Sequence, residues 1–354
     1  PVFRRAFSVI KMTGNKDRVL RARASNQRIP MSQPILYVAF SPDSVRPESW
    51  NALNEAARGF DIRAGGKEAV ENDLDRVEIC LGWIPADLLG RMRHLKWYQN
   101  MGAGMEWLAH LDAYWESDPI FTGASGVHPI QITEHIFAFI LGWNRRLHFA
   151  MRRQVEGKYP KRQGDRPDDL EGKTMLIFGI GAIGERTAAV AKAFGMHTIG
   201  VRRNTARTFP SVDRMVDPGN LLAVLPEADT VVNAAPYSPQ THHVFGAEAF
   251  AAMRPGAFYV NIGRGKTTDE AALVEALRSG HIAGAGLDVF EEEPLPESSP
   301  LYHLDNVILT GHYAGQSIHY HDRLLDVFIE NLRRYLRNEP LANAFTRSDF
   351  QGRD

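Results

Sequence analysis

Cysteine is almost absent from this chain, whose 354 residues include only Cys80. A single cysteine excludes an intrachain disulfide framework and suits a reducing compartment, so we expect a cytoplasmic protein. Cys80 stands in the mostly apolar run 77–81, which favours a buried structural thiol over a nucleophile. The 13 histidines show no metal-ligand spacing with Cys80, so we predict no metal site.

Long apolar runs are also missing, because no stretch reaches the length that crosses a membrane, and we expect no membrane partner. Acidic residues are scarce in residues 1–30, which hold only Asp17 against eight basic residues. This surplus of seven positive charges leaves −8 for the remainder of a chain whose total charge is −1. An acidic body is unsuited to a nucleic-acid backbone, so we expect no nucleic-acid partner.

The basic N-terminal extension, residues 1–33, allows three interpretations. It has the Arg-rich, acid-poor composition of an organellar transit peptide, which leaves organellar targeting open. A nucleic-acid-binding arm is the second interpretation, although interleaved aromatic residues are missing. We favour the third, an extension ahead of Met31, and we assign the segment no chemistry.

Strand-like apolar runs alternate with helical stretches through the rest of the chain, which predicts parallel α/β sheets. A first series has strands at 35–40, 77–81 and 95–99 and a helix at 46–58, and a single long helix follows at 129–154. A second series begins at Lys173. Its further strands are expected at 196–201, 230–234, 258–262, 284–289 and 307–310.

Two later helices have clear sequence signals. One is predicted to begin at Thr267, where residues 267–270 fit a capping box, and to stop at Gly280. The last, at 317–338, places one apolar face on Leu324, Leu325, Phe328, Leu332 and Tyr335. No strand is expected after it, so the helix should pack back on the first domain. We therefore predict a discontinuous domain of 34–127 plus 316–354 and a second domain of 128–315.

The loop GIGAIG (179–184) follows an apolar strand and opens a helical run, which is typical of a dinucleotide-binding turn. Gly179 permits the tight turn, Gly181 lets the backbone approach a pyrophosphate, and Gly184 permits close packing of helix on strand. The helix N-terminus, with the amides of Ala182 and Ile183, favours the anion.

About twenty residues further on, NAD-binding units usually carry an acidic residue that accepts from the ribose 2′-hydroxyl. This chain has Arg202 and Arg203 there, with Thr205 close by. Because an arginine pair attracts a 2′-phosphate, we predict NADP(H) in preference to NAD(H). A solvated basic turn is the alternative.

Three short motifs follow in order: NIGRG (261–265), LDVFEEEP (287–294) and GHYAG (311–315). They supply Arg264, Glu293 and His312. A guanidinium, a carboxylate and an imidazole suit the binding of a 2-oxo acid and the protonation of its carbonyl during hydride transfer. We therefore predict an enzyme.

With LEGKTMLIFGIGAIG, ADTVVNAAPYSPQT, MRPGAFYVNIGRG, AGAGLDVFEEEP and GHYAG, the chain resembles the D-isomer-specific 2-hydroxyacid dehydrogenases. The arginine pair is most similar to NADP-dependent glyoxylate/hydroxypyruvate reductases within that family. The predicted fold is two doubly wound parallel-sheet domains, Rossmann-like or flavodoxin-like, with an interdomain cleft.

The resemblance implies roles for the motif residues. Arg264 would bind the substrate carboxylate and carbonyl oxygen, and His312 would give the carbonyl oxygen a proton. Glu293 would hold the other ring nitrogen of His312 and favour the protonated imidazole, with Glu291 and Glu292 as adjacent alternatives. Asp288 would hydrogen-bond the nicotinamide carboxamide. The other residues expected beside the cofactor are Ala235, Pro236, Thr241, Ile262, Gly263, Ala314 and Gly315.

The segment LKWYQNMGAGMEWL resembles the family's substrate loop, where Met101, Gly102, Ala103 and Gly104 would aim backbone N–H groups at the substrate carboxylate. Trp83 is interpreted equally as a pocket residue or a packing aromatic. Three residues depart from the family pattern, and the two bulky ones among them would narrow or reshape the substrate pocket. They are Gly311, where the family usually has proline, and the bulky Met105 and Trp107.

The leading hypothesis is an NADPH-dependent reductase that converts a small 2-oxo acid, such as glyoxylate or hydroxypyruvate, to the D-2-hydroxy acid. A phosphoglycerate-type dehydrogenase is an alternative that the arginine pair disfavours. A non-catalytic, nucleotide-sensing module of the corepressor type is another, because a fold does not fix a function. Members of the family pair long apolar helices such as the one at 129–154 across a two-fold axis, so the resemblance implies a homodimer.

Overall fold

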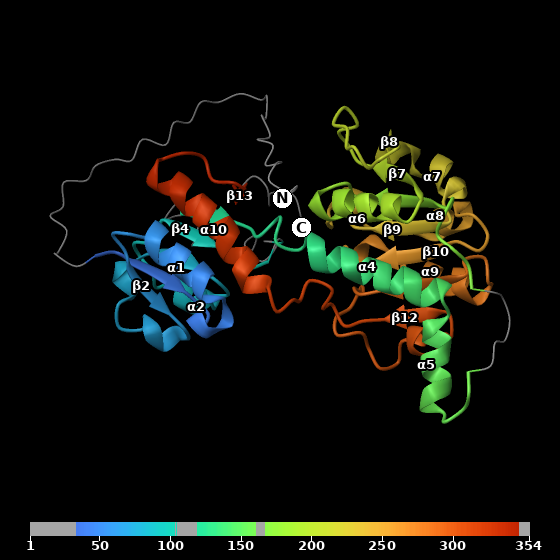
Figure 1. Cartoon of the computed structure of the whole chain (residues 1–354), viewed down its shortest axis with the longest axis horizontal. Coiled ribbons are helices and arrows are strands. Elements are labelled where there is room, and N and C mark those ends of the chain that lie inside the picture. Colours follow the sequence, from blue (N-terminus) through green and yellow to red (C-terminus); the bar gives the residue numbers. More distant parts are fainter. Residues whose placement is uncertain (1–32, 103, 105–118, 161–166, 347–354) are drawn as a thin grey trace. The chain divides into compact units, whose positions relative to one another are not determined.

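Two mainly parallel β-sheets, each packed between helices or turns on its two faces, make up the fold (Figure 1). This computed structural model describes residues 33–102, 104, 119–160 and 167–346. Residues 1–33 and 34–354 separate as two units, and everything below concerns the second. The predictions on the basic N-terminal extension, Ala103, Met105 and Trp107 fall outside the described residues.

The first sheet, sheet A, has the order β13-β5-β4-β3-β1-β2. Its strands are β1 (Ile35–Val38), β2 (Asp61–Ala64), β3 (Val77–Leu81), β4 (Trp97–Gln99), β5 (Ile120–Thr122) and β13 (Ala344–Phe345). Only β13 pairs antiparallel, with β5. The order 2-1-3-4-5 of the parallel strands is flavodoxin-like.

Both faces of sheet A are apolar, as expected for a parallel sheet covered on two sides. Leu36 and Val38 face a cluster made with α1 (Pro47–Ala56) and α10 (Tyr320–Leu336). Tyr37 and Cys80 face the opposite cluster, which includes α2 (Ala86–Leu89). Cys80 is fully buried, and burial raises the pKa of its thiol, so the prediction of a structural cysteine is confirmed.

The second sheet, sheet B, is entirely parallel with the order β12-β11-β10-β9-β6-β7-β8. Its strands are β6 (Thr174–Phe178), β7 (His197–Val201), β8 (Arg214–Val216), β9 (Thr230–Asn233), β10 (Phe258–Asn261), β11 (Gly284–Leu287) and β12 (Val307–Leu309). The chain runs outward from β6 to β8 and then returns to β9, next to β6. The strand order therefore reverses between β6 and β9, where doubly wound sheets bind ligands.

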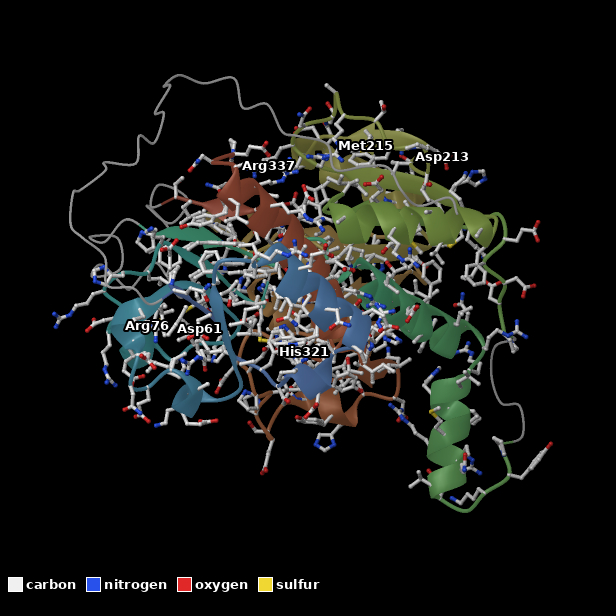
Figure 2. All side chains as sticks on the ribbon, turned by 60° about the vertical axis from the view of Figure 1, so that its left-hand side comes forward. Asp61, Arg76, Asp213, Met215, His321 and Arg337 are labelled. Atoms are coloured by element: carbon white, nitrogen blue, oxygen red, sulfur yellow. The ribbon has the colours of Figure 1, made fainter. Side chains whose placement is uncertain are left out.

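Helices cover sheet B on both faces (Figure 1). One face carries α4 (Pro129–Asn144) and α6 (Ala182–Ala193), and the other carries α7 (Leu221–Val224), α8 (Ala247–Ala252) and α9 (Glu270–Arg278). At the β8 edge, Asp213, which is labelled in Figure 2, accepts from the amide of Thr198 at 2.8 Å and pairs with Lys192 at 2.9 Å. This carboxylate joins the start of β7 to α6.

The single long helix predicted at 129–154 is wrong. α4 ends at Asn144, and α5 (Leu147–Val155) starts after Arg146, whose φ of 60° is left-handed. A residue in that conformation cannot continue a right-handed helix, so the two helices take different directions (Figure 1).

The predicted start of the helix at Thr267 is also wrong. The Thr267 oxygen accepts from Nδ2 of Asn233 at 2.7 Å, and its hydroxyl donates to the carbonyl oxygen of Arg264 at 2.6 Å, so the side chain is engaged away from the helix. α9 begins at Glu270 instead, and the Asp269 side chain accepts from the amide of Ala272 at 3.0 Å. Gly280, with φ 72°, ends the helix region as predicted.

The last helix is confirmed as α10, which buries Leu324, Leu325, Phe328 and Leu332 against sheet A. The expectation that no strand follows it is wrong, because β13 comes next and pairs with β5. His319 is exposed, whereas His321 is half-buried and stacks on Phe40 with ring centroids 4.4 Å apart. The domain boundaries and the interdomain cleft stay predictions.

Candidate active site

The glycine-rich loop joins β6 to α6 at the point where the strand order reverses. Gly179 has φ 103°, and a Cβ there would lie 2.7 Å from the amide nitrogen of Ala235. A Cβ on Gly184 would lie 2.5 Å from the carbonyl oxygen of Gly179, whereas one on Gly181 would meet nothing within 4 Å. Two glycines therefore permit close packing, and the third faces open space.

The N-terminus of α6 lies at that open space. Gly181 is the residue before the helix, and Glu185 donates its amide to the carbonyl oxygen of Gly181 at 2.8 Å. The amides of the first turn, including those of Ala182 and Ile183, have no acceptor within the helix. The loop is therefore suited to hold a phosphate group.

The turn after β7 carries three arginines. The guanidinium carbons of Arg202 and Arg207 lie 5.5 Å and 4.7 Å from the ring centroid of the buried Phe209, and Arg203 and Thr205 are exposed. Burial, and then the charge of Arg207, lower the pKa of Arg202. Among the described residues, none of the three arginines forms an ion pair. A cluster of this kind attracts an anion.

Sequence reasoning missed Arg207. The signal was present, because Arg207 follows Arg202 by five residues across a single turn. Its part in the cluster depends on Phe209, whose ring holds both guanidinium groups. We call Arg202, Arg203 and Arg207 the arginine turn.

Three neighbouring strands of sheet B end in the residues that the motifs singled out. Arg264 follows β10, Asp288 follows β11, and His312 follows β12. The carboxyl ends of parallel strands meet at one edge of a sheet, so the tertiary fold brings the three motifs together.

His312 and Glu293 form a close pair. The Nδ1 atom of His312 lies 2.6 Å from Oε2 of Glu293, while Oε1 of Glu293 accepts from the amide of Phe290 at 3.0 Å. Glu291 instead accepts from the amide of Glu270 at 2.8 Å. Of the three adjacent glutamates, Glu293 therefore holds the imidazole, and Nε2 of His312 is the atom available to a substrate.

The loop that carries His312 is anchored on Asp288, which is almost fully buried. Its Oδ1 atom accepts from the hydroxyl of Thr310 at 2.6 Å and from the amide of Tyr313 at 3.1 Å. Its Oδ2 atom accepts from the amide of Ala314 at 3.1 Å. The backbone amide of His312 donates to the Asp288 carbonyl oxygen at 2.8 Å. Asp288 therefore organises this loop, a role that sequence reasoning missed.

Arg264 is held by its own turn. Its Nη1 atom donates to the carbonyl oxygen of Gly263 at 2.8 Å, and its carbonyl oxygen accepts from the Thr267 hydroxyl. A Cβ on Gly263 would lie 2.5 Å from the carbonyl oxygen of Ala235, so this turn packs closely on the end of β9. Sequence reasoning also missed His128, whose pKa is lowered by burial and then by the charge of Arg264.

The remaining predicted cofactor residues lie in the segments that follow β9, β10 and β12. Ala235, Ile262 and Ala314 are buried, and the carbonyl oxygen of Gly315 accepts from Gln131 at 3.0 Å. The Thr241 hydroxyl is engaged within its turn, since it accepts from the amide of Ser238 at 2.7 Å and donates to the Pro236 carbonyl oxygen at 3.0 Å.

The described part of the predicted substrate loop belongs to sheet A. The Nδ2 atom of Asn100 donates to the carbonyl oxygens of Gly102 and Gly104 at 3.2 Å and 2.9 Å. The Tyr320 hydroxyl donates to the Met101 carbonyl oxygen. These contacts orient the carbonyl groups of the loop. Trp83 is 66% exposed, which argues against the packing interpretation.

A pocket of about 630 Å³ opens beside the His312–Glu293 pair. Its lining consists of Phe290, Glu293, Pro294, Leu295, Tyr302, Leu309, Thr310, Gly311, His312 and Tyr313. Within the described ranges, no group of three or more His, Cys, Asp or Glu residues is arranged to hold a metal ion, and no helix there is long and apolar enough to cross a membrane.

The chain has many relatives. The family model described as "D-isomer specific 2-hydroxyacid dehydrogenase, NAD binding domain" matches residues 137–314. An (S)-sulfolactate dehydrogenase from Chromohalobacter salexigens is 30% identical over 284 residues, which are 80% of this chain and 89% of the relative. A glyoxylate reductase from Korarchaeum cryptofilum is 36% identical over 62% of this chain and 66% of the relative. A D-3-phosphoglycerate dehydrogenase from Methanocaldococcus jannaschii is 32% identical over 73% of this chain, which spans only 49% of that relative.

Solved structures of the same family are also similar to this chain. A D-isomer specific 2-hydroxyacid dehydrogenase from Xanthobacter autotrophicus, in complex with NADPH and MES, has a TM-score of 0.73 at 30% identity and covers 90% of this chain and 99% of its own. An NADPH-dependent glyoxylate/hydroxypyruvate reductase from Sinorhizobium meliloti, in complex with NADP and sulfate, has a TM-score of 0.73 at 26% identity with the same coverage. This chain therefore belongs to the D-isomer specific 2-hydroxyacid dehydrogenase family and is an NAD(P)-dependent oxidoreductase.

Proposed function

We propose that the chain reduces a small 2-oxo acid to the D-2-hydroxy acid with NADPH. The observation that carries the proposal is the 2.6 Å contact between His312 and Glu293 at the sheet edge where Arg264 also lies. This edge supplies an imidazole with one free nitrogen and a guanidinium, which match the carbonyl and the carboxylate of a 2-oxo acid.

Arg264, His312 and Glu293 have different tasks in the proposed reaction. Arg264 binds the substrate carboxylate through paired N–H donors and polarises the carbonyl oxygen. His312 donates the proton on Nε2 to that oxygen while Glu293 holds Nδ1–H. The bound nicotinamide supplies the hydride. In the oxidative direction His312 accepts the proton back.

The residues fit a dinucleotide. The open space at Gly181 and the first-turn amides of α6 suit the pyrophosphate, and the arginine turn suits a 2′-phosphate. Two similar solved structures hold NADPH or NADP. These observations support NADP(H) over NAD(H).

Glyoxylate and hydroxypyruvate are the proposed substrates, because relatives bear the names of glyoxylate reductase and glyoxylate/hydroxypyruvate reductase. Other relatives are named for sulfolactate and 3-phosphoglycerate, which are also 2-hydroxy acids. A phosphoglycerate-type dehydrogenase therefore stays the second candidate, and the arginine turn is the feature that weighs against it.

The first experiment follows the absorbance of NADPH and NADH with glyoxylate, hydroxypyruvate, pyruvate, phenylpyruvate and 3-phosphohydroxypyruvate. Arg264→Ala removes the guanidinium, and Arg264→Lys keeps the charge but loses the paired donors. We expect turnover with NADPH that Arg264→Ala abolishes and Arg264→Lys restores only weakly. Cofactor binding without turnover of any 2-oxo acid would point to a nucleotide-sensing module instead.

We also propose a homodimer, on a different surface from the one that the sequence indicated. The apolar residues of α4, including Ile136 and Ile140, are buried in the core of sheet B. Apolar side chains are exposed instead on and after α5, where Leu147, Met151 and Val155 follow at helical spacing and Val155 is 90% exposed. Light scattering of Met151→Glu/Val155→Glu tests this, and we expect a dimer to become a monomer.

A further inference from the structure

We propose that His135 is a positioning residue that holds the His312 loop in its working conformation through Thr310 and Asp288. The inference rests on the proposed function, since it assigns His312 as the proton donor. His135 belongs to α4, far from the three motifs in the sequence, and its hydrogen bonds and ring contacts in the described part of the chain involve neither Glu293 nor His312.

A chain of short contacts connects His135 to the loop. Its Nε2 atom lies 2.9 Å from the Thr310 hydroxyl oxygen, and that hydroxyl lies 2.6 Å from Oδ1 of Asp288. Nε2 of His135 is itself 3.8 Å from the same carboxylate oxygen. Asp288 then accepts the amides of Tyr313 and Ala314, which directly follow His312.

The direction of each hydrogen bond follows from the chemistry. The ionised Asp288 carboxylate can only accept, so Thr310 gives its single hydroxyl proton to Asp288. The Thr310 oxygen must then accept from His135, which requires the tautomer with the proton on Nε2. His135 is therefore the donor that begins the chain, and a side chain without a donor there would leave Thr310 and Asp288 less firmly held.

Aromatic neighbours keep the ring of His135 in place. It meets Phe139 edge-on with centroids 4.6 Å apart, and Tyr313 edge-on at 5.6 Å. Burial lowers the pKa of His135, although the charge of Asp288 opposes the shift, so the neutral imidazole is favoured. The contact with Tyr313 bears most directly on the loop, because Tyr313 is the residue next to His312.

The loop needs such an anchor for two reasons. His312 has φ 55°, a left-handed conformation that non-glycine residues hold only when the surroundings impose it. The residue before it is Gly311, whose missing side chain adds backbone freedom on the side where Thr310 is attached. The hydrogen bonds that Asp288 accepts supply the constraint, and His135 orients the threonine that donates to this carboxylate.

Two matched pairs of variants test the proposal. His135→Phe keeps a flat ring and removes the donor, whereas His135→Gln keeps an N–H group at similar reach. Thr310→Val removes the hydroxyl, and Thr310→Ser retains it. We expect kcat with the best 2-oxo acid to fall on the order of 10- to 100-fold in the Phe and Val variants, because small displacements of reacting groups have effects of that size. We expect the Kd for NADPH to change less than about twofold, and the Gln and Ser variants to recover most of the rate.

A second measurement does not depend on turnover. Hydrogen exchange followed by mass spectrometry reports the amides of residues 310–315, and we expect faster exchange in the Phe and Val variants than in the Gln and Ser variants. Unchanged exchange and unchanged kcat in a folded His135→Phe protein would overturn the proposal. A wild-type protein that turns over no 2-oxo acid would contradict the proposed function alone, and the exchange rates would still decide whether His135 holds the loop.

Discussion

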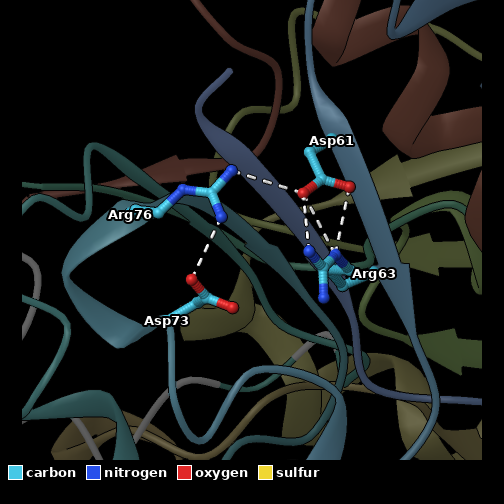
Figure 3. Close-up of polar contacts among 4 residues, drawn as sticks. All are labelled: Asp61, Arg63, Asp73 and Arg76. Carbon is cyan, nitrogen blue, oxygen red and sulfur yellow. Dashed lines mark hydrogen bonds and ion pairs between the residues drawn. The ribbon is translucent and has the colours of Figure 1, made fainter. Parts of the chain in front are cut away.

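Each sheet has arginines near the strand that comes second in the chain, β2 in sheet A and β7 in sheet B. The arginines near β2 are paired with carboxylates, and those after β7 are not, in the part of the chain that the structure describes. In sheet A, Arg63 of β2 makes paired contacts with Asp61 at 2.9–3.1 Å, and Arg76 bridges Asp61 at 3.3 Å and Asp73 at 3.0 Å (Figure 3). Figure 2 shows Asp61 and Arg76 from further away. In sheet B, the arginine turn that follows β7 has no ion pair within the described residues, although two of its guanidinium groups share the ring of Phe209.

This difference suggests that the charges near β2 stabilise the fold, whereas the arginine turn binds an anion. Two arginines and two aspartates in sheet A compensate each other, so this cluster has no need of a ligand. Three arginines gathered in sheet B repel each other, and an anion from outside relieves that repulsion. The comparison predicts that substitutions in sheet B change activity or cofactor choice, and that those in sheet A change stability.

The largest effect is expected at the carboxyl edge of sheet B. His312→Gln removes the proton donor but keeps a polar side chain, so kcat should fall by on the order of 10² to 10⁴, as for other general acids. Steady-state kinetics and thermal unfolding of the same preparation measure it. If His312→Gln lowered the unfolding temperature enough to explain the lower kcat, the division into activity effects in sheet B and stability effects in sheet A would be contradicted.

A smaller effect is expected in the arginine turn. Arg207→Ala removes one charged donor for a 2′-phosphate, so KM for NADPH should rise roughly 10-fold or more while KM for NADH changes little. Arg63→Ala in sheet A is the matched control and should leave both constants unchanged. Equal changes for the two cofactors in Arg207→Ala would show that the arginine does not recognise the phosphate.

In sheet A, Asp61→Asn should lower the free energy of unfolding by about 1 kcal/mol at most, because the cluster is partly exposed and screened. The side-chain hydrogen bond from Arg63 lowers the pKa of Asp61 below its ordinary value of 3.8. Its stabilisation is therefore present above pH 3.8 and is lost as the pH falls through the lower folded-state pKa. Urea unfolding at pH 7 and in acid measures both, and a variant as stable as wild type at pH 7 would show that the cluster is inert.

The smallest effect is expected from Gly311→Ala at the carboxyl edge of sheet B. This substitution changes no charge, so it should affect stability and not activity even though it lies at this edge of sheet B. A Cβ on Gly311 would meet nothing within 4 Å, and its φ is not left-handed. Gly311→Ala should therefore raise the free energy of unfolding by roughly 0.4–1 kcal/mol through the unfolded chain, with turnover nearly unchanged. Chemical denaturation checks the sign, and a destabilised variant would mean that the loop needs the freedom of glycine.

Local sequence determined much of this protein. The glycine loop, the order of the three motifs and the apolar face of α10 depend on residues close together in the chain, so their backbone preferences and spacing are legible before folding. Gly184 packs on Gly179 within one strand–turn–helix unit, whereas the close approach at Gly179 is to Ala235, which follows β9. The short edge strand β2 and the two-residue strand β13 are not legible in this way, because their pairing comes from neighbours elsewhere in the chain.

Only the tertiary structure decided which polar residues support the site. Thr310 and His135 are 175 residues apart, and Thr310 and Asp288 are 22 apart, so no short motif contains them. The break at Arg146 depends on a left-handed backbone in a sequence that reads as continuous helix. Sequence patterns report local periodicity, whereas a hydrogen-bond chain across three elements exists only after the sheet has brought those elements together.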